Sequence, residues 1–355
     1  AGAGEGVDAE RPVSNLEPPT EWVNETPTAW FVQLSSPPAA EGTSSSTLKG
    51  ERKDFRRTAA KAGIDFTVRR AFSELFHGYS IEIDAGQLGR LTQLPQVAAV
   101  YPVLSVPMPA TTVSGPDMGT AIQMTGADIV QDTLGFTGAG IKVAVMDTGI
   151  DYDHPDLGSG FGPGYKVAYG YDFVGDDYNA DPTSATYNPV PSPDPDPDDC
   201  QGHGTHVAGI VGADGTVVGV APDVTLGAYR VFGCDGSTDA DIMIAAMEMA
   251  LADGMDVLNM SIGSAFTWPQ YPTAVAADYL VDAGMVVVAS IGNSGDYAAY
   301  AAGAPGLGEK VIGVASYDNT HASLPYFTVG GADIGYVAMD FAGPTPTSGT
   351  EEIVY

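Results

Sequence analysis

Apolar and polar positions follow two different rhythms along the chain. Between residues 30 and 103, short half-apolar strand patterns are mixed with amphipathic helical ones. After residue 140, nearly continuous apolar runs recur, separated by helical patterns. The first rhythm predicts a small α+β unit, and the second predicts a larger α/β unit.

The first rhythm predicts the element order βαββαβ, a split-βαβ or ferredoxin-like arrangement. The expected strands are 30–34, 64–72, 76–83 and 97–103, and the expected helices are 47–62 and 85–94. We assign this domain to residues 28–109, after a flexible leader at 1–27 that is rich in Pro, Glu, Thr and Asn. Residues 105–117 are predicted to form an exposed linker, with 110–120 as its processing segment.

The second rhythm predicts a doubly wound, mostly parallel sheet covered by helices on both faces, within residues 121–320. The apolar strand runs are 141–149, 224–231, 255–263, 285–293 and 310–316, and the helical patterns are 240–254 and 272–284. Active residues of such sheets gather beyond the carboxyl ends of the strands. That rule points to Asp147, Ser261 and Asn293.

The charge balance restricts which partners the protein can bind. Lys and Arg total 14 against 45 Asp and Glu, a net charge of −31, and 10 of the 14 basic residues precede residue 110. So negative a surface excludes nucleic acid and anionic membranes as partners. No window approaches the length of an apolar membrane span, and the first residues lack both a Met and an apolar signal core. We therefore expect a secreted monomer whose signal peptide has been removed.

Three polar residues at predicted strand or helix ends could carry chemistry. Asp147 follows a buried strand, His203 opens a helix of small residues in GHGTHVAGIVG (202–212), and Asn293 follows Gly292. A histidine oriented by a carboxylate can take a proton from a hydroxyl nucleophile, and an amide can donate to an oxyanion. Taken singly, the three are also consistent with a turn Asp, a capping His and a turn Asn.

Four ordered motifs together resemble the subtilisin family (subtilases) of serine peptidases. They are VAVMDTGIDYDHPDL (143–157), GHGTHVAGIVG (202–212), VLNMSIGS (257–264) and SIGNSG (290–295). The order of Asp before His agrees with that family. The resemblance implies that Asp147 orients His203, that His203 is the general base and that Asn293 is the oxyanion donor.

The same resemblance implies where a substrate binds. Ser261, Ile262 and Gly263 would pair with an extended substrate backbone. Ser290, Ile291 and Gly292 would line the primary pocket. His206, three residues after His203, is expected to be a packing residue.

The preceding unit is similar to the subtilisin propeptide, an inhibitor and folding assistant, through LFHGYSIEID (75–84) and VAAVYPV (97–103). The resemblance implies that its tail lies in the active-site cleft as a product would, with cleavage within 108–118. Its basic residues would face an acidic partner and speed docking. We therefore expect a zymogen that acts on polypeptides and is first inhibited by its own propeptide.

The family's nucleophile motif, Gly-Thr-Ser-x-Ala-x-Pro, does not occur in the 355 residues. Ser348 lies in the different sequence TSGTEE (347–352) and is not taken as the nucleophile. Residues 321–355 resemble the opening of a protease-associated domain, which some larger family members insert before the serine. We expect a chain truncated before its serine and therefore inactive alone.

Cysteines and acidic loops leave two questions open. Cys200 and Cys234 are the whole thiol content, either as one disulfide or as two free buried thiols. The acidic loop 188–200 either binds structural calcium or is a solvated, Pro-stiffened loop. Asp156 matches a family calcium position, but the segment 213–222 is short for the family's calcium loop. No cofactor or metal is expected to take part in the chemistry.

Two other functions fit parts of the sequence. One is a catalytically silent subtilisin fold that binds peptides. The other is a metal-dependent hydrolase using Asp147, His154, His203 and His206, although HGTH differs from a zinc-binding helix with His at i and i+4.

Overall fold

A computed structural model describes most of the chain. The described residues are 27–109, 118–295, 300–317, 319–321 and 326–335. The predicted leader, most of the processing segment and most of 321–355 lie outside them. No helix among the described residues is long and apolar enough to cross a membrane.

The N-terminal part forms the predicted βαββαβ unit around a four-stranded antiparallel sheet in the order β2-β3-β1-β4. Its elements are β1 (Ala29–Leu34), η1 (Ala39–Glu41), α1 (Ser45–Lys61), β2 (Phe66–Phe72), β3 (Gly78–Ile83), η2 (Ala85–Gln87), α2 (Leu88–Leu91) and β4 (Val97–Pro102). The helix predicted at 85–94 is wrong in extent. Asp84 caps the amide of Gly86, and two glycines weaken a helix here, so only a 3₁₀ turn and one α-turn form.

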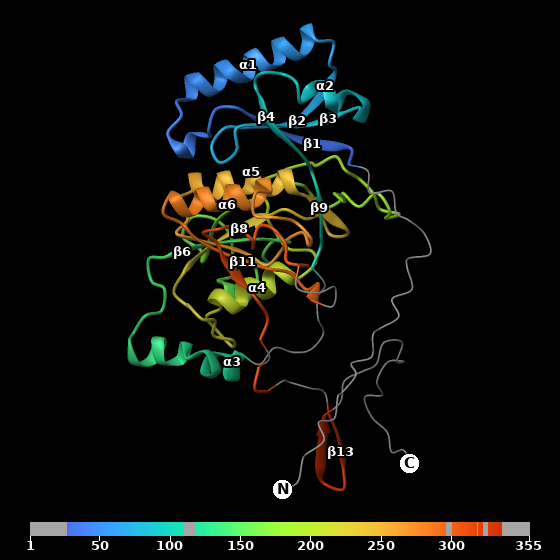
Figure 1. Ribbon diagram of the computed structural model, residues 1–355. Coiled ribbons are helices and arrows are strands. Elements are labelled where there is room, and N and C mark those ends of the chain that lie inside the picture. Colours follow the sequence, from blue (N-terminus) through green and yellow to red (C-terminus); the bar gives the residue numbers. More distant parts are fainter. Residues whose placement is uncertain (1–26, 110–117, 296–299, 318, 322–325, 336–355) are drawn as a thin grey trace, which may run out of the picture.

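Alternation along β1 divides the apolar side chains between two layers. Val32 and Leu34 point to the core under α1, whereas Phe31 joins the core that contains α5 and α6. Figure 1 shows α1 on the far side of the four-stranded sheet from α5 and α6. The sheet is therefore packed between its own helices and the larger unit.

The larger unit contains a six-stranded parallel sheet in the order β12-β11-β10-β6-β8-β7. Its strands are β6 (Lys142–Asp147), β7 (Val167–Asp172), β8 (Thr225–Arg230), β10 (Val257–Met260), β11 (Val286–Ser290) and β12 (Ile312–Val314). The main helices are α4 (His203–Gly212), α5 (Ala240–Ala252) and α6 (Pro272–Asp282). The smaller elements are α3 (Met118–Thr125), η3 (Ile129–Thr133), η4 (Pro155–Leu157), β5 (Ser105–Pro107), β9 (Ser237–Asp239), β13 (Tyr326–Val329) and β14 (Ala332–Gly335).

Strand β6 shows why both faces of this sheet are apolar. Ala144 and Met146 belong to the core with α5 and α6, and Val143 and Val145 belong to a second core with Val207 of α4. The predicted doubly wound α/β fold is confirmed. Its parallel strands bring the ends of β6, β10 and β11 to one edge.

Three details of the prediction are wrong. The edge strand β7 was missed. The linker predicted at 105–117 begins with a strand, because β5 pairs with β9 and buries Val106 to 1% exposure. Helix α3 begins at Met118, inside the segment expected to be a linker.

Candidate active site

Asp147 and His203 meet at the carboxyl edge of the six-stranded sheet. Asp147 ends β6 and is fully buried, and His203 opens α4. The Nδ1 atom of His203 lies 2.8 Å from Oδ1 of Asp147. A carboxylate only accepts, so Nδ1 donates, and Nε2 remains the ring nitrogen that can take a proton. The same Oδ1 accepts the amide of Thr148 at 2.8 Å.

The two groups shift each other's protonation. Burial acts to lower the pKa of His203, but the hydrogen bond and charge of Asp147, aided by the charge of Asp199, raise it above 6.5 overall. Burial raises the pKa of the Asp147 carboxyl, and the bond from His203 opposes this rise. Asp147 therefore stabilises the protonated imidazolium, the form a general base becomes during reaction.

His206 gives an internal reference for this shift. Burial and the charge of His203 lower the pKa of His206 below 6.5. We expect an NMR titration of the 355-residue chain to find His203 protonated at higher pH than His206. Replacing Asp147 by Asn should bring the His203 pKa down. Because this pKa is raised by folding, the stabilisation from the charged pair is present below about pH 6.5 and is lost as pH rises through the folded pKa. Titration of His203 and His206 at the same pH would contradict the raised pKa of His203.

Short polar contacts fix the start of α4. Asp199 accepts the amides of Gln201 and Gly202 at 2.9 Å each through one oxygen, and its other oxygen accepts the Thr205 hydroxyl at 2.6 Å. Gln201 accepts the amide of His203 at 2.8 Å. These bonds satisfy amides that a helix start leaves free, and they hold His203 against Asp147.

The other predicted residues lie at the same edge. Ser261–Gly263 directly follow β10, and Asn293 is an exposed residue three positions beyond β11. Gly292 has φ 103°, a left-handed conformation that favours glycine and turns the chain before Asn293. Ser290 and Ile291 are partly buried at the end of β11. The described contacts do not include one between Asn293 and His203.

An extended segment of the chain itself lies along this edge. Val106 of β5 pairs antiparallel with Thr238 of β9, and the Met108 amide donates to the Gly236 carbonyl at 3.0 Å. The side-chain amide (Nε2) of Gln201 donates to the carbonyl of Pro109 at 3.1 Å. The pairing edge is thus β9, which the sequence analysis missed. Among the described bonds, the 261–264 edge contributes only the Ser264 hydroxyl, which donates to the Ser105 carbonyl at 3.3 Å.

Among the described hydrogen bonds, none joins His154 or His206 to Asp147 or His203. His154 and His206 both line an apolar pocket of about 760 Å³ beside α3 and α4. His206 is exposed there, so its prediction as a packing residue is wrong. Within the described part of the chain, the four residues of the proposed metal hydrolase do not form a cluster of ligand atoms.

Asp156 has a protein partner where the family resemblance suggested calcium. Its Oδ2 accepts the amide of Val217 at 2.9 Å, and its backbone carbonyl accepts the amide of Asp214. Backbone bonds from Val217 and Thr216 lower the pKa of the Asp156 carboxyl. The carboxylate thus fastens the short segment after α4 directly.

We expect Asp156→Ala to lower the melting temperature equally in calcium and in chelator, because the lost partners are backbone amides. The exposed Asp153→Ala is the matched control and should change little. A calcium-induced rise in melting temperature that disappears only in Asp156→Ala would show that the carboxylate binds the ion.

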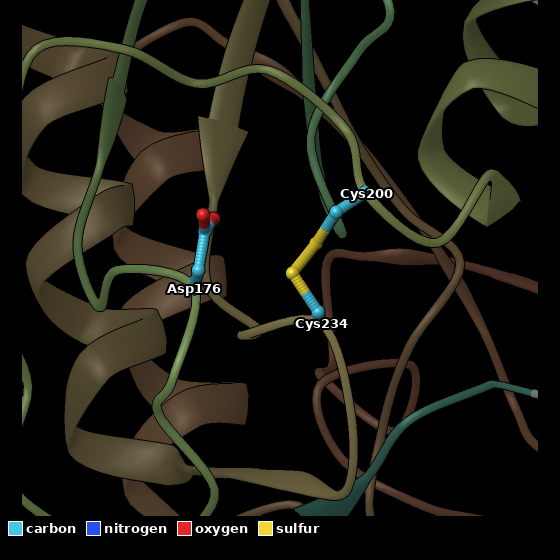
Figure 2. Close-up of side chains that lie close together, drawn as sticks. All are labelled: Asp176, Cys200 and Cys234. Atoms are coloured by element: carbon cyan, nitrogen blue, oxygen red, sulfur yellow. A yellow bond between two sulfur atoms is a disulfide. The ribbon is translucent and has the colours of Figure 1, made fainter.

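The two cysteines form a disulfide, with an S–S distance of 2.06 Å. Figure 2 shows it beside Asp176, and the three side chains form the one group of metal-ligand type among the described residues. Both sulfurs are bonded to each other, so they offer no thiolate to a metal. The disulfide joins the segment before His203 to the segment after β8.

The Asp147–His203 pair lies at the carboxyl edge of a parallel α/β sheet, next to a strand that pairs with extended chain. The acid and base of a triad hydrolase have this arrangement. A model of the Subtilase family matches residues 138–347, more than half of the chain. The chain belongs to the Subtilase family, whose members are serine peptidases.

Curated relatives agree with this assignment, and a solved structure agrees with the fold. The chain is 40% identical over 286 residues to the minor extracellular protease Vpr of Bacillus subtilis, covering 78% of this chain and 34% of that protein. It is 37% identical over 216 residues to subtilisin DY of Bacillus licheniformis, covering 59% of this chain and 68% of the relative. The epidermin leader peptide processing serine protease of Staphylococcus aureus shares the fold, with a TM-score of 0.57, 18% identity and coverage of 81% and 69%.

Proposed function

We propose that this chain is part of a secreted serine endopeptidase made as an autoprocessed zymogen. The observation that carries the proposal is the 2.8 Å contact between Nδ1 of His203 and the buried carboxylate of Asp147. It is supported by membership of the Subtilase family and by relatives named as extracellular proteases.

In the proposed reaction, a serine hydroxyl attacks the peptide carbonyl while Nε2 of His203 takes its proton. Asp147 holds the imidazole through Nδ1 and stabilises the imidazolium. The Asn293 side-chain amide donates to the oxyanion, and His203 then returns the proton to the leaving amine. Ser290, Ile291 and Gly292 line the primary pocket, and Ser261, Ile262 and Gly263 form one wall of the substrate site. No metal or cofactor takes part in these steps.

We propose that residues 28–109 are the propeptide and that their tail occupies the substrate site. The pairing of β5 with β9 and the bond from the Gln201 side chain to the Pro109 carbonyl support this, because the backbone of a peptide substrate would make the same contacts. Cleavage would follow within 108–118, leaving 121–320 as the catalytic domain and 321–355 as the start of a protease-associated domain.

The nucleophile is not assigned to any of the 355 residues. Because the chain covers only 34% of Vpr, a longer protein can hold the serine outside this sequence. The 355 residues alone should therefore hydrolyse no peptide bond, since a base without its nucleophile cannot form an acyl-enzyme.

The test compares casein hydrolysis by the 355-residue chain and by the protein extended with the sequence that follows Tyr355 in its gene. We expect hydrolysis only by the extended protein, with inhibition by a serine-directed reagent and not by a chelator. Inhibition by the chelator alone would overturn the proposal in favour of metal chemistry.

A second candidate is a silent subtilisin fold that binds peptides, favoured by the lack of the nucleophile motif in these residues. It predicts that the extended gene sequence also lacks Gly-Thr-Ser-x-Ala-x-Pro. It further predicts that the extended protein binds extended peptides without cleaving them.

A further inference from the structure

Arg230 is a buried guanidinium next to the candidate catalytic pair. It ends β8 opposite Asp147 in the register of the parallel sheet, and it is 3% exposed. The amide of Val231, the next residue, donates to the Asp147 carbonyl at 3.0 Å. Arg230 is therefore one strand away from the carboxylate that binds His203.

All three nitrogens of the guanidinium are engaged. Nε donates to the carbonyl of Phe232 at 3.0 Å, and Nη1 donates to the carbonyl of Asp198 at 3.0 Å. Nη1 also pairs with Asp172 at 3.2 Å, and Nη2 pairs with Asp176 at 2.8 Å. A guanidinium has five N–H groups in a fixed fork, which suits such a set of partners.

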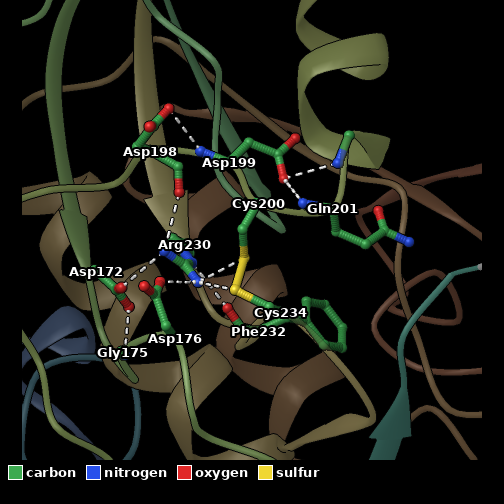
Figure 3. Close-up of a disulfide and its surroundings, with 11 residues drawn as sticks. Asp172, Gly175, Asp176, Asp198, Asp199, Cys200, Gln201, Arg230, Phe232 and Cys234 are labelled. Atoms are coloured by element: carbon green, nitrogen blue, oxygen red, sulfur yellow. Dashed lines mark hydrogen bonds and ion pairs between the residues drawn. A yellow bond between two sulfur atoms is a disulfide. The ribbon is translucent and has the colours of Figure 1, made fainter.

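The disulfide lies on the same guanidinium. Nη2 contacts Sγ of Cys200 at 3.1 Å and Sγ of Cys234 at 3.6 Å. Figure 3 shows Arg230 between the two acidic side chains and the sulfur atoms, with the carbonyl of Asp198 above it in this view. We call Arg230, Asp172, Asp176 and the Cys200–Cys234 disulfide the Arg230 clamp.

The clamp holds the segment that positions His203. The Arg230 guanidinium contacts Asp198 and Cys200, the two neighbours of Asp199. Asp199 in turn accepts the amide of Thr205 at the start of α4. On the other side, this segment packs against Gly149, where an added Cβ would lie 2.8 Å from the carbonyl of Asp198. The segment is thus fixed from both sides, three residues before His203.

We propose that the Arg230 clamp is a positioning device for His203 and makes the catalytic pair sensitive to reducing agents. Arg230 acts through the segment 198–201 and does not touch the reacting atoms. The inference rests on the proposed function for the role of His203. A dithiol such as dithiothreitol would convert the Cys200–Cys234 bond to two thiols and itself become a cyclic disulfide, so that the electrons and protons balance.

Loss of the clamp should change the geometry of the pair more than the fold. A displacement of about 1 Å at a catalytic group can cost roughly a hundredfold in rate. In the extended protein, the Cys200→Ser/Cys234→Ser variant and Arg230→Lys should lower kcat by about tenfold to a hundredfold with little change in KM. Lysine keeps the charge but lacks the fork that reaches several partners at once.

The test is an NMR titration of the 355-residue chain with ¹⁵N-labelled histidine, which needs no peptidase activity. Compared are the oxidised chain, the chain treated with dithiothreitol, Cys200→Ser/Cys234→Ser and Arg230→Lys. We expect the pKa of His203 to fall towards 6.5 and its far-downfield Nδ1 proton signal to weaken in all three altered forms. The disulfide variant keeps the guanidinium and its carboxylates, so it gives an answer even if Arg230→Lys does not fold.

Leu280→Ala is the control for general destabilisation, because Leu280 is buried on α6 in the core with α5, whereas α4 packs on the second core. It should lower the melting temperature without changing the His203 signals. An unchanged His203 pKa and Nδ1 signal after loss of the disulfide would overturn the inference. Failure of the extended protein to hydrolyse casein would instead overturn the proposed function, and the titration would still decide the role of the clamp.

Discussion

Replacing Asp147 by Asn is expected to lower kcat of the extended protein by about 10⁴-fold, the size of loss that an Asp-to-Asn change causes in a Ser-His-Asp triad. The reason is that Asn cannot stabilise the imidazolium, and its amide can turn the imidazole to the wrong tautomer. KM should change little, because Asp147 is fully buried and 2.8 Å from His203. Steady-state kinetics on a peptide substrate measure both constants.

Asp151→Asn is the control for this change, since Asp151 lies in the loop after β6 and its carboxylate makes no described bond to His203. It should keep kcat within a few-fold, as for surface changes away from the reacting groups. A loss of less than tenfold in Asp147→Asn would show that the pair is not the acid–base centre.

Replacing Arg69 by Met is expected to weaken the packing of the four-stranded sheet on the larger unit by about 3–5 kcal/mol, because it leaves buried carboxylates unpaired. Arg69 lies at the irregularity between Val68 and Arg70 in the β2–β3 ladder. Its guanidinium pairs with Asp239 at 2.5 Å and with the fully buried Asp241 at 3.1 Å.

The effect of Arg69→Met should depend on pH. Burial raises the pKa of Asp239 to about 6 even with Arg69 present. Without Arg69 the Asp239 carboxylate should bind a proton more readily. The variant should therefore be least stable at neutral pH, and the deficit should shrink as pH falls and Asp239 is protonated.

Urea unfolding, monitored by amide hydrogen exchange in β1–β4, measures this loss of stability. Arg57→Met is the matched control, since the Arg57–Asp54 pair is largely exposed and should contribute at most about 1 kcal/mol. Equal losses of stability in Arg69→Met and Arg57→Met would contradict the claim that the buried ion pairs of Arg69 hold the sheet on the larger unit.

The ion pairs of Arg69 are distinct from the predicted effect of overall charge on docking, which stays a prediction. Six basic residues lie on α1, which covers the far face of the four-stranded sheet. Among the described residues, the ion pairs that join this sheet to the larger unit are those of Arg69. The ion pairs of this contact are therefore local ones. One arginine reaches two buried carboxylates.

The strands and the Asp147–His203 pair could be predicted because their signals are local. The run at 141–149 is apolar on both faces, and the order of the motifs identified a family whose fold brings the two residues together. Strand β7 was missed because VAYGYD is an edge strand with glycine, tyrosines and four partly buried positions, so it lacks a continuous apolar run.

The contacts that support the site could not be predicted, because they join distant segments. β9 is three residues long, and its Ser237 meets Ser105 from 132 positions earlier. The Arg230 clamp likewise depends on the relative placement of β8, the segment after β7 and the acidic loop. None of these has a sequence period, and only the folded sheet brings them together.

The rate of fluorophosphonate labelling of the extended protein as a function of pH tests the acid–base role of His203 most directly. We predict labelling of one serine outside the 355 residues, at a rate that falls as pH drops through the raised pKa of His203, and no labelling in His203→Ala. Labelling that persists in His203→Ala, or labelling of the 355-residue chain itself, would contradict the account.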